Sequence, residues 1–154
     1  MSVLPSYTGL HFEEIYMSSV KFYSNIEDSL LKFAVIVSRY NGSWVFCKHR
    51  ERSTYEVPGG HRENGEDIFT TAKRELWEET GAVDYSLTPI CVYSVVDDTT
   101  ETFGMLYYAE IKRFEHLPQS EIEKIEFFHG LPEFWTYPDT QPFLIKKIKQ
   151  TIKI

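Results

Sequence analysis

The stretch 58–81 constrains the fold of this chain more tightly than any other part of the sequence. It begins with a Pro-Gly-Gly turn, passes through a polar loop and continues with apolar residues at helical spacing. Asp67 can cap the start of a helix, because its side-chain oxygen can accept a free amide hydrogen of the first turn. Gly81 suits a left-handed C-terminal cap, so a helix is predicted over about 68–80. The stripe that would anchor this helix to a core consists of Phe69, Ala72 and Leu76.

The same stretch concentrates carboxylates. Glu66 precedes the helix and can swing towards it, and Glu75, Glu78 and Glu79 are spaced three and four residues apart, so they share one helical face. Carboxylates at this density repel each other, and their best use is to hold divalent cations, which most often handle phosphate oxygens. Arg74 is placed to orient one or more of the glutamates. A solvated acidic face is the alternative, but the glycine turn, the loop and Arg74 together favour a metal site.

This pattern resembles the Nudix box, here spanning residues 60–82. The matching residues are Gly60, Glu66, Arg74, Glu75, Leu76, Glu78, Glu79 and Gly81. One residue departs, Ala82, which is small where the pattern prefers a larger aliphatic side chain. The approach to the box over 55–60 and the segment 121–133 are also similar to the family, so the resemblance covers roughly residues 30–150.

The resemblance implies the Nudix fold, an α/β architecture with a mixed β-sheet sandwiched between α-helices. It also implies a hydrolase for a nucleoside diphosphate linked to another group, working with Mg²⁺ or Mn²⁺. The metal-binding set carried over to this chain is Gly60, Glu75, Glu78, Glu79 and Glu121, with Glu123 as the substitute for Glu121. The catalytic set is Arg74 together with Glu78, Glu79 or Glu121 as the base that takes a proton from water.

Candidate substrate-binding residues lie on both sides of the box. Lys48, Arg50 and Arg52 precede the glycine turn and would serve either as phosphate contacts or as solvated charges. Tyr55 could stack on a base. The same two roles, stacking or core packing, are open to the aromatic residues Phe134, Trp135 and Tyr137, and packing is favoured for the first two.

The start of the last helix is a further candidate region. Thr140 stands where mutator-type Nudix enzymes that bind oxidised guanine have an asparagine, which weakens any claim of that selectivity. Asp139 could contact a base edge instead. A helix-capping role for Thr140 is the simpler account.

Composition bounds the remaining possibilities. At 154 residues the chain is expected to form one domain, 1–154, and its net charge of -7 argues against a general nucleic-acid binder. No apolar run is long enough for a membrane helix, and the first residues do not resemble a signal peptide. Cys47 and Cys91 are expected to be buried, reduced thiols, which favours a cytoplasmic location. No nucleophile stands beside a patterned histidine and acid, so water must attack.

The remaining elements follow from hydrophobic patterning. Residues 1–17 show no clear pattern and are expected to form a lead-in. Strands are predicted over 18–24, 31–38, 43–48, 86–96, 102–111 and 125–129. Asn41-Gly42 predicts a hairpin, and Gly104 a bulge. A last helix after Thr140 would bury Leu144, Ile148 and Ile152.

The resulting hypothesis is Mg²⁺-dependent hydrolysis of a nucleoside triphosphate, a dNTP or an 8-oxo-dGTP-like nucleotide, to the monophosphate and pyrophosphate. Removal of pyrophosphate from the 5′ end of RNA is the first alternative. Other nucleoside-diphosphate substrates and a nucleotide sensor without turnover are further alternatives. The protein is expected to be a monomer or a homodimer that does not associate with membranes.

Overall fold

The computed structural model describes residues 19–154. The predicted lead-in over 1–17 and the first residue of the predicted strand 18–24 lie outside them. The elements are β1 (Val20–Tyr23), the short 3₁₀ helix η1 (Asp28–Leu30), β2 (Leu31–Tyr40), β3 (Ser43–His49), β4 (Gly59–His61), α2 (Ile68–Thr80), β5 (Ala82–Val96), β6 (Glu101–Phe114), β7 (Ile122–Phe128) and α3 (Gln141–Thr151).

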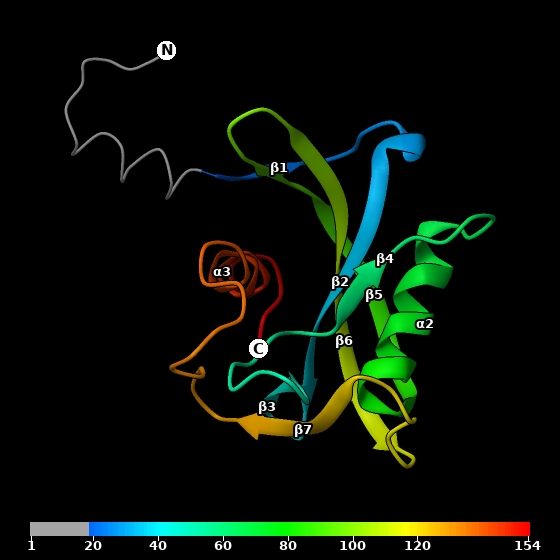
Figure 1. Ribbon diagram of the computed structural model, residues 1–154, viewed down its shortest axis with the longest axis vertical. Helices are drawn as coiled ribbons and strands as arrows, with labels where there is room; N and C mark the ends of the chain where they lie inside the picture. Colours follow the sequence, from blue (N-terminus) through cyan, green and yellow to red (C-terminus); the bar gives the residue numbers. More distant parts are fainter. Residues whose placement is uncertain (1–18) are drawn as a thin grey trace.

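The strands form a 7-stranded sheet in the order β1-β5-β6-β2-β3-β7, with β4 paired to β2. The β2–β6 pair is parallel, and the other pairs are antiparallel, so the sheet is mixed. Helices α2 and α3 cover opposite faces, as Figure 1 shows with α2 in green and α3 in red. One core lies under α3 and the other under α2. The predicted mixed sheet between helices is confirmed.

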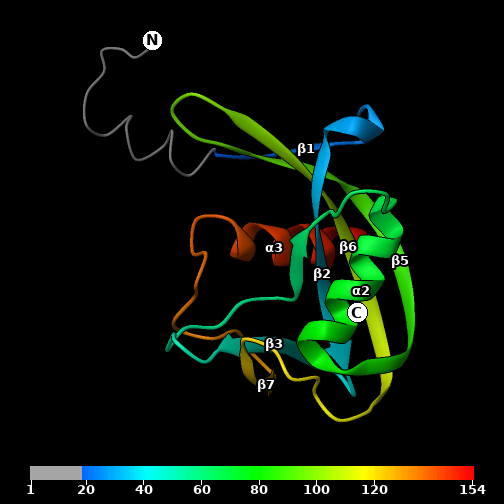
Figure 2. The same ribbon diagram turned by 45° about the vertical axis from the view of Figure 1, so that its right-hand side comes forward.

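Strand β2 changes partners along its length. Near its start, Phe33, Ala34 and Val35 pair with β4, and at its end Tyr40 pairs with β3. The amide of Ile36 instead donates to the carbonyl of Pro58 at 2.9 Å, so the glycine turn is bonded to the middle of β2. Figure 2 shows β3 leading away from β2 on the side where α2 ends, while β4 lies beside β2. The candidate site forms around this divergence.

The hairpin and the box helix form as predicted. Asn41 and Gly42 both have positive φ values, 50° and 81°, and connect Tyr40 to its partner Ser43 as a two-residue turn. In α2, Asp67 accepts a hydrogen bond from the amide of Thr70 at 2.8 Å, and Gly81 has a φ of 78°.

The predicted anchoring stripe of α2 is partly wrong. Ala72 and Leu76 are fully buried. Phe69 is 41% exposed, and its ring contacts that of Tyr107. Thr71 is buried in its place, because its hydroxyl donates to Glu66. A polar side chain can occupy the buried face when its hydrogen bond is made.

Several strand predictions need correction. β5 and β7 begin earlier than predicted, because pairing continues to Ala82, opposite Phe114, and to Ile122, opposite His49. The bulge expected at Gly104 lies on the neighbouring strand, where the β2–β6 register skips one residue between Leu31 and Phe33. The ring of Phe33 fills the space that a side chain at position 104 would need.

The last helix buries its predicted stripe. Leu144 and Ile148 are fully buried, and Ile152 packs against the same core. Thr140 occupies the N-cap position of this helix, as predicted, but its hydroxyl makes no cap hydrogen bond within the described chain. Instead, the buried Gln141 accepts a hydrogen bond from the amide of Val57 at 2.9 Å, which ties the start of α3 to the approach to the glycine turn.

Candidate active site

The glycine turn and the last two turns of α2 fit closely together. The amide of Gly59 donates to Glu79 Oε1 at 2.9 Å, and the Glu79 side chain is almost completely buried. A side chain at position 60 would overlap the Glu75 carboxylate, so the absence of a side chain there lets this carboxylate lie against the strand. The turn therefore fixes two of the three predicted helix ligands.

Arg74 connects most of the remaining acidic groups. Its Nε and Nη2 atoms bond both oxygens of Glu66, at 2.5 Å and 3.0 Å. Its Nη1 atom lies 2.9 Å from Glu75 and 3.3 Å from Glu78. These contacts place Arg74 where the sequence analysis expected an orienting cation.

Glu66 reaches α2 from the loop and is joined to the helix glutamates through Arg74. Its Oε1 also accepts hydrogen bonds from the Thr71 hydroxyl at 2.7 Å and from the amide of Glu63 at 3.0 Å. The hydrogen bonds, above all those from Arg74, lower the pKa of Glu66 to about 2. Glu66 therefore closes the loop onto α2 and holds Arg74 in place.

The buried glutamates have the opposite electrostatic character. Burial raises the pKa of Glu79 to about 8, and the nearby carboxylates of Glu75, Glu56 and Glu121 add to this effect, while the amide of Gly59 opposes it. Burial also raises the pKa of Glu75, against the hydrogen bond from Arg74. Carboxylates crowded in this way are stabilised as anions by a cation in their midst.

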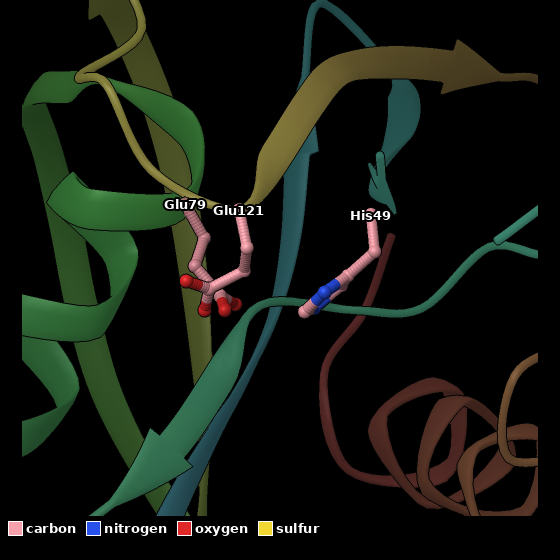
Figure 3. Close-up of side chains that lie close together, drawn as sticks. All are labelled: His49, Glu79 and Glu121. Atoms are coloured by element: carbon pink, nitrogen blue, oxygen red, sulfur yellow. The ribbon is translucent and has the colours of Figure 1, made fainter. Parts of the chain in front are cut away.

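One group of side chains has the spacing of a metal site. Ligand atoms of His49, Glu79 and Glu121 all lie within 4.8 Å of one another. They come from the end of β3, the last turn of α2 and the bend before β7, and Figure 3 shows the two carboxylates meeting while the imidazole points towards them from the opposite side. Two carboxylates and an imidazole suit a divalent cation, so the residues fit the metal that the family uses.

Glu121, and not its substitute Glu123, joins this group. Glu123 forms an ion pair with Lys48 at 2.6 Å, away from Glu79. The β3–β7 register skips Glu123, because Lys48 pairs with Lys124 and His49 pairs with Ile122. This irregularity separates the two glutamates in space.

The three basic candidates are engaged with protein groups. Lys48 pairs with Glu123, and Arg52 pairs with Glu56 at 3.0 Å. Arg50 donates its backbone amide to the carbonyl of Glu121 at 2.9 Å and its side-chain Nε to the carbonyl of Ser120 at 3.1 Å. Arg50 thus fastens the loop that carries Glu121.

The aromatic candidates divide into packed and exposed residues. The Tyr55 ring packs edge-on against Phe128, and its hydroxyl donates to Glu126 at 3.0 Å. Both parts of this side chain therefore have partners within the protein. Trp135 packs against Phe46, as favoured by the sequence. Phe134 does not pack as favoured, because it is 62% exposed. Tyr137 is also exposed.

The two candidates at the start of α3 do not join the acidic cluster. Asp139 is exposed in the turn before the helix, and Thr140 is partly buried there. Two residues that sequence reasoning missed as site residues, His49 and Glu56, lie beside Glu79. The signal available was the acidic residue before the Pro-Gly-Gly turn, but nothing in the spacing placed His49 there.

Comparisons with known proteins identify the family of this chain. The family model for the NUDIX domain matches residues 29–147. The chain therefore belongs to the Nudix family and is a Nudix hydrolase. Within residues 19–154, no helix is both long and apolar enough to cross a membrane.

Individual relatives show which Nudix proteins this chain is similar to. The chain is 31% identical over 130 residues to YtkD of Bacillus subtilis (strain 168), whose name assigns it, provisionally, an 8-oxo-dGTP diphosphatase activity; the match covers 78% of this chain and 82% of YtkD. The crystal structure of a mutant of the Bacillus subtilis pyrophosphohydrolase BsRppH has a TM-score of 0.72 at 28% identity, over 85% of this chain and 90% of that chain. A UDP-X diphosphatase shares the fold, with a TM-score of 0.67 at 14% identity, over 94% of this chain and 71% of that chain.

Proposed function

We propose that this protein uses Mg²⁺ or Mn²⁺ to hydrolyse a nucleoside triphosphate, a dNTP or an oxidised dGTP, to the monophosphate and pyrophosphate. The observation that carries the proposal is the buried carboxylate of Glu79, fixed by the amide of Gly59 and facing Glu121. The likeness to YtkD supports the choice of a nucleotide substrate. We further propose that the chain works as one domain in a reducing compartment such as the cytoplasm, because its two cysteines are free thiols.

The position of each residue indicates its role in the proposed reaction. Glu79, Glu75 and Glu121, with Gly60, would hold the cation, and Arg74 would keep Glu75 and Glu78 in place. When bound, such a cation offsets the charge of the phosphate oxygens and makes a water molecule more acidic. The water adds across the anhydride bond, and its proton passes to a carboxylate.

The base is one of the two exposed carboxylates, Glu78 or Glu121. Glu79 is a poor candidate, because its carboxylate is buried and bonded to Gly59. Replacing the base with glutamine should lower kcat by roughly 10²–10⁴-fold while cation affinity changes less. Measuring kcat and cation affinity for both Glu78→Gln and Glu121→Gln distinguishes the base from a cation ligand.

The first experiment measures pyrophosphate release with Mg²⁺ from dGTP, 8-oxo-dGTP and a short 5′-triphosphorylated RNA. Glu79→Gln is the inactive variant, and Glu123→Gln is the matched control, because Glu123 is exposed and pairs with Lys48. Release from the free nucleotides, lost in Glu79→Gln and retained in the control, supports the proposal. Near-full turnover by Glu79→Gln would overturn the site assignment.

The likeness to the pyrophosphohydrolase BsRppH keeps the RNA 5′ end as a second candidate substrate. Recognition of RNA needs contacts beyond the first nucleotide, and phosphate contacts make binding weaken steeply with salt. The basic residues nearest the site are paired with protein groups, which is evidence against this candidate. If the enzyme prefers the RNA, with strong salt dependence, the RNA 5′ end becomes the first candidate substrate and the free nucleotides the second. Nucleotide binding without any metal-dependent product would instead indicate a sensor.

A further inference from the structure

We propose that an imidazole nitrogen of His49 is a ligand of the divalent cation held by Glu79 and Glu121, and that this nitrogen favours Mn²⁺ over Mg²⁺. The inference rests on the proposed function for the presence of the cation. It adds a residue outside the box, and it makes the site a mixed nitrogen and oxygen site. The observation behind it is that the ligand atoms of all three residues lie within 4.8 Å of one another.

The backbone holds His49 next to Glu121. His49 pairs with Ile122 across the β3–β7 ladder, and the amide of the following residue, Arg50, bonds the carbonyl of Glu121 at 2.9 Å. The Arg50 side chain bonds the carbonyl of Ser120 as well. The histidine and the carboxylate therefore sit on two segments that cannot drift apart without breaking these hydrogen bonds.

A second carboxylate, that of Glu56, lies beside the imidazole ring. Glu56 Oε1 lies 3.6 Å from His49 Nε2, and Arg52 holds the same oxygen at 3.0 Å. The His49 side chain is 20% exposed, so a cation and a substrate can still reach it. Carboxylates beside a metal-bound imidazole commonly fix the ring orientation and raise its basicity.

The preference for Mn²⁺ over Mg²⁺ follows from the kinds of ligand atom in the site. Mg²⁺ prefers oxygen ligands and gives up its water reluctantly. Mn²⁺ also binds carboxylates well, but as a first-row transition metal it accepts an imidazole nitrogen more readily than Mg²⁺ does. A site of carboxylates alone would bind both ions through the same oxygens. Loss of His49 should therefore weaken Mn²⁺ binding more than Mg²⁺ binding.

The test uses the full-length protein without a histidine tag, loaded with Mn²⁺ below one equivalent and without nucleotide. Electron spin-echo envelope modulation detects ¹⁴N bonded directly to Mn²⁺. We expect ¹⁴N modulation in the wild type and in the control His129→Gln, whose histidine is exposed beyond the end of β7. We expect its loss in His49→Gln and in wild-type protein labelled with ¹⁵N-histidine. The Mn²⁺ affinity of His49→Gln should fall at least about tenfold, and its Mg²⁺ affinity should change less.

The outcomes separate this inference from the proposed function. Bound Mn²⁺ without ¹⁴N modulation in the wild type, modulation that survives in His49→Gln, or no Mn²⁺ binding would each overturn the inference. The labelled wild type keeps the test decisive if His49→Gln does not fold. Nitrogen modulation in a protein that releases no pyrophosphate would leave the ligand assignment standing and remove the proposed function. Pyrophosphate release without nitrogen modulation would do the reverse.

Discussion

Arg74 is the cation on which the acidic helix face depends. Its planar fork bonds both oxygens of Glu66 and reaches Glu75 and Glu78. Lysine carries the same charge but cannot reproduce the bidentate geometry. We expect Arg74→Lys to lower cation affinity and turnover at least about tenfold with the fold intact, measured by Mn²⁺ titration and initial rates. Arg113→Lys is the control, because Arg113 makes an exposed pair with Glu115; equal effects of the two changes would contradict the assignment.

Glu66 makes the stability of this ion pair depend on pH. Its pKa is about 2 in the folded protein, against an ordinary value of 4.5. Because the folded value is lower, the stabilisation is present above about pH 4.5 and is lost as the pH falls through about 2. We expect Glu66→Gln to lower Tm at neutral pH, and the difference from the wild type to shrink as the pH falls through this window.

The comparison for this pH effect is Glu63→Gln. Glu63 lies on the same loop, but its side chain is 67% exposed. Its carboxylate comes no closer to Arg74 than 3.7 Å, so the ion pair is weaker than that of Glu66. A Tm difference for Glu66→Gln that stays constant with pH would show that the ion pair does not contribute in this way.

Strand β4 contributes two glycines with different tasks. An added Cβ at Gly59 would lie 2.7 Å from the backbone carbonyl oxygen of Ala34, whereas one at Gly60 would meet only the mobile end of Glu75. We expect Gly59→Ala to destabilise the fold by about 1–3 kcal/mol. Gly60→Ala should keep Tm nearly unchanged but displace the Glu75 carboxylate and reduce turnover. Thermal melts and rates of the two variants test this contrast, and a Gly60→Ala protein with normal turnover would argue against a role for Glu75.

Helix α3 is fastened to the site through its first residue. Gln141 is buried and accepts the amide hydrogen of Val57, so Gln141→Ala would leave that amide unsatisfied. The expected cost is about 1–3 kcal/mol of unfolding free energy, measurable by urea denaturation. Gln150→Ala, at the exposed end of the same helix, should cost much less. A similar midpoint for both variants would rule out the tether.

The molecule as a whole should gain stability from its cation. Glu75 and Glu79 are buried near each other, and an ion that binds only the folded state stabilises it by about 2.7 kcal/mol at 100 times its Kd. We expect Mn²⁺ or Mg²⁺ to raise Tm by several degrees and a chelator to reverse the shift. Glu79→Gln should lose most of the shift, while its metal-free Tm stays equal or rises, because the most buried of the clustered carboxylates is removed. An unchanged shift in Glu79→Gln would place the cation elsewhere.

Much of the architecture could be predicted because the deciding interactions are local. Asp67 and Gly81 cap α2 through bonds to residues within one turn, and Asn41-Gly42 makes its hairpin by its own backbone preference. The errors concern side-chain contacts, which residue spacing alone does not determine. Phe69 is exposed while the buried Thr71 donates to Glu66, and Thr140 stands at the N-cap without a side-chain cap bond.

The sequence by itself determined the acidic helix, its glycine turn and the family, because helical spacing and turn chemistry depend on residues a few positions apart. Only the tertiary structure decided which other side chains meet Glu79. Glu121 rather than Glu123 faces it, and His49 joins them, because the β3–β7 register skips one residue. A register shift of one residue changes the side chain presented at each position, and that shift involves residues about 70 positions apart, such as His49 and Ile122. No local pattern can encode a choice made by strand pairing over that separation.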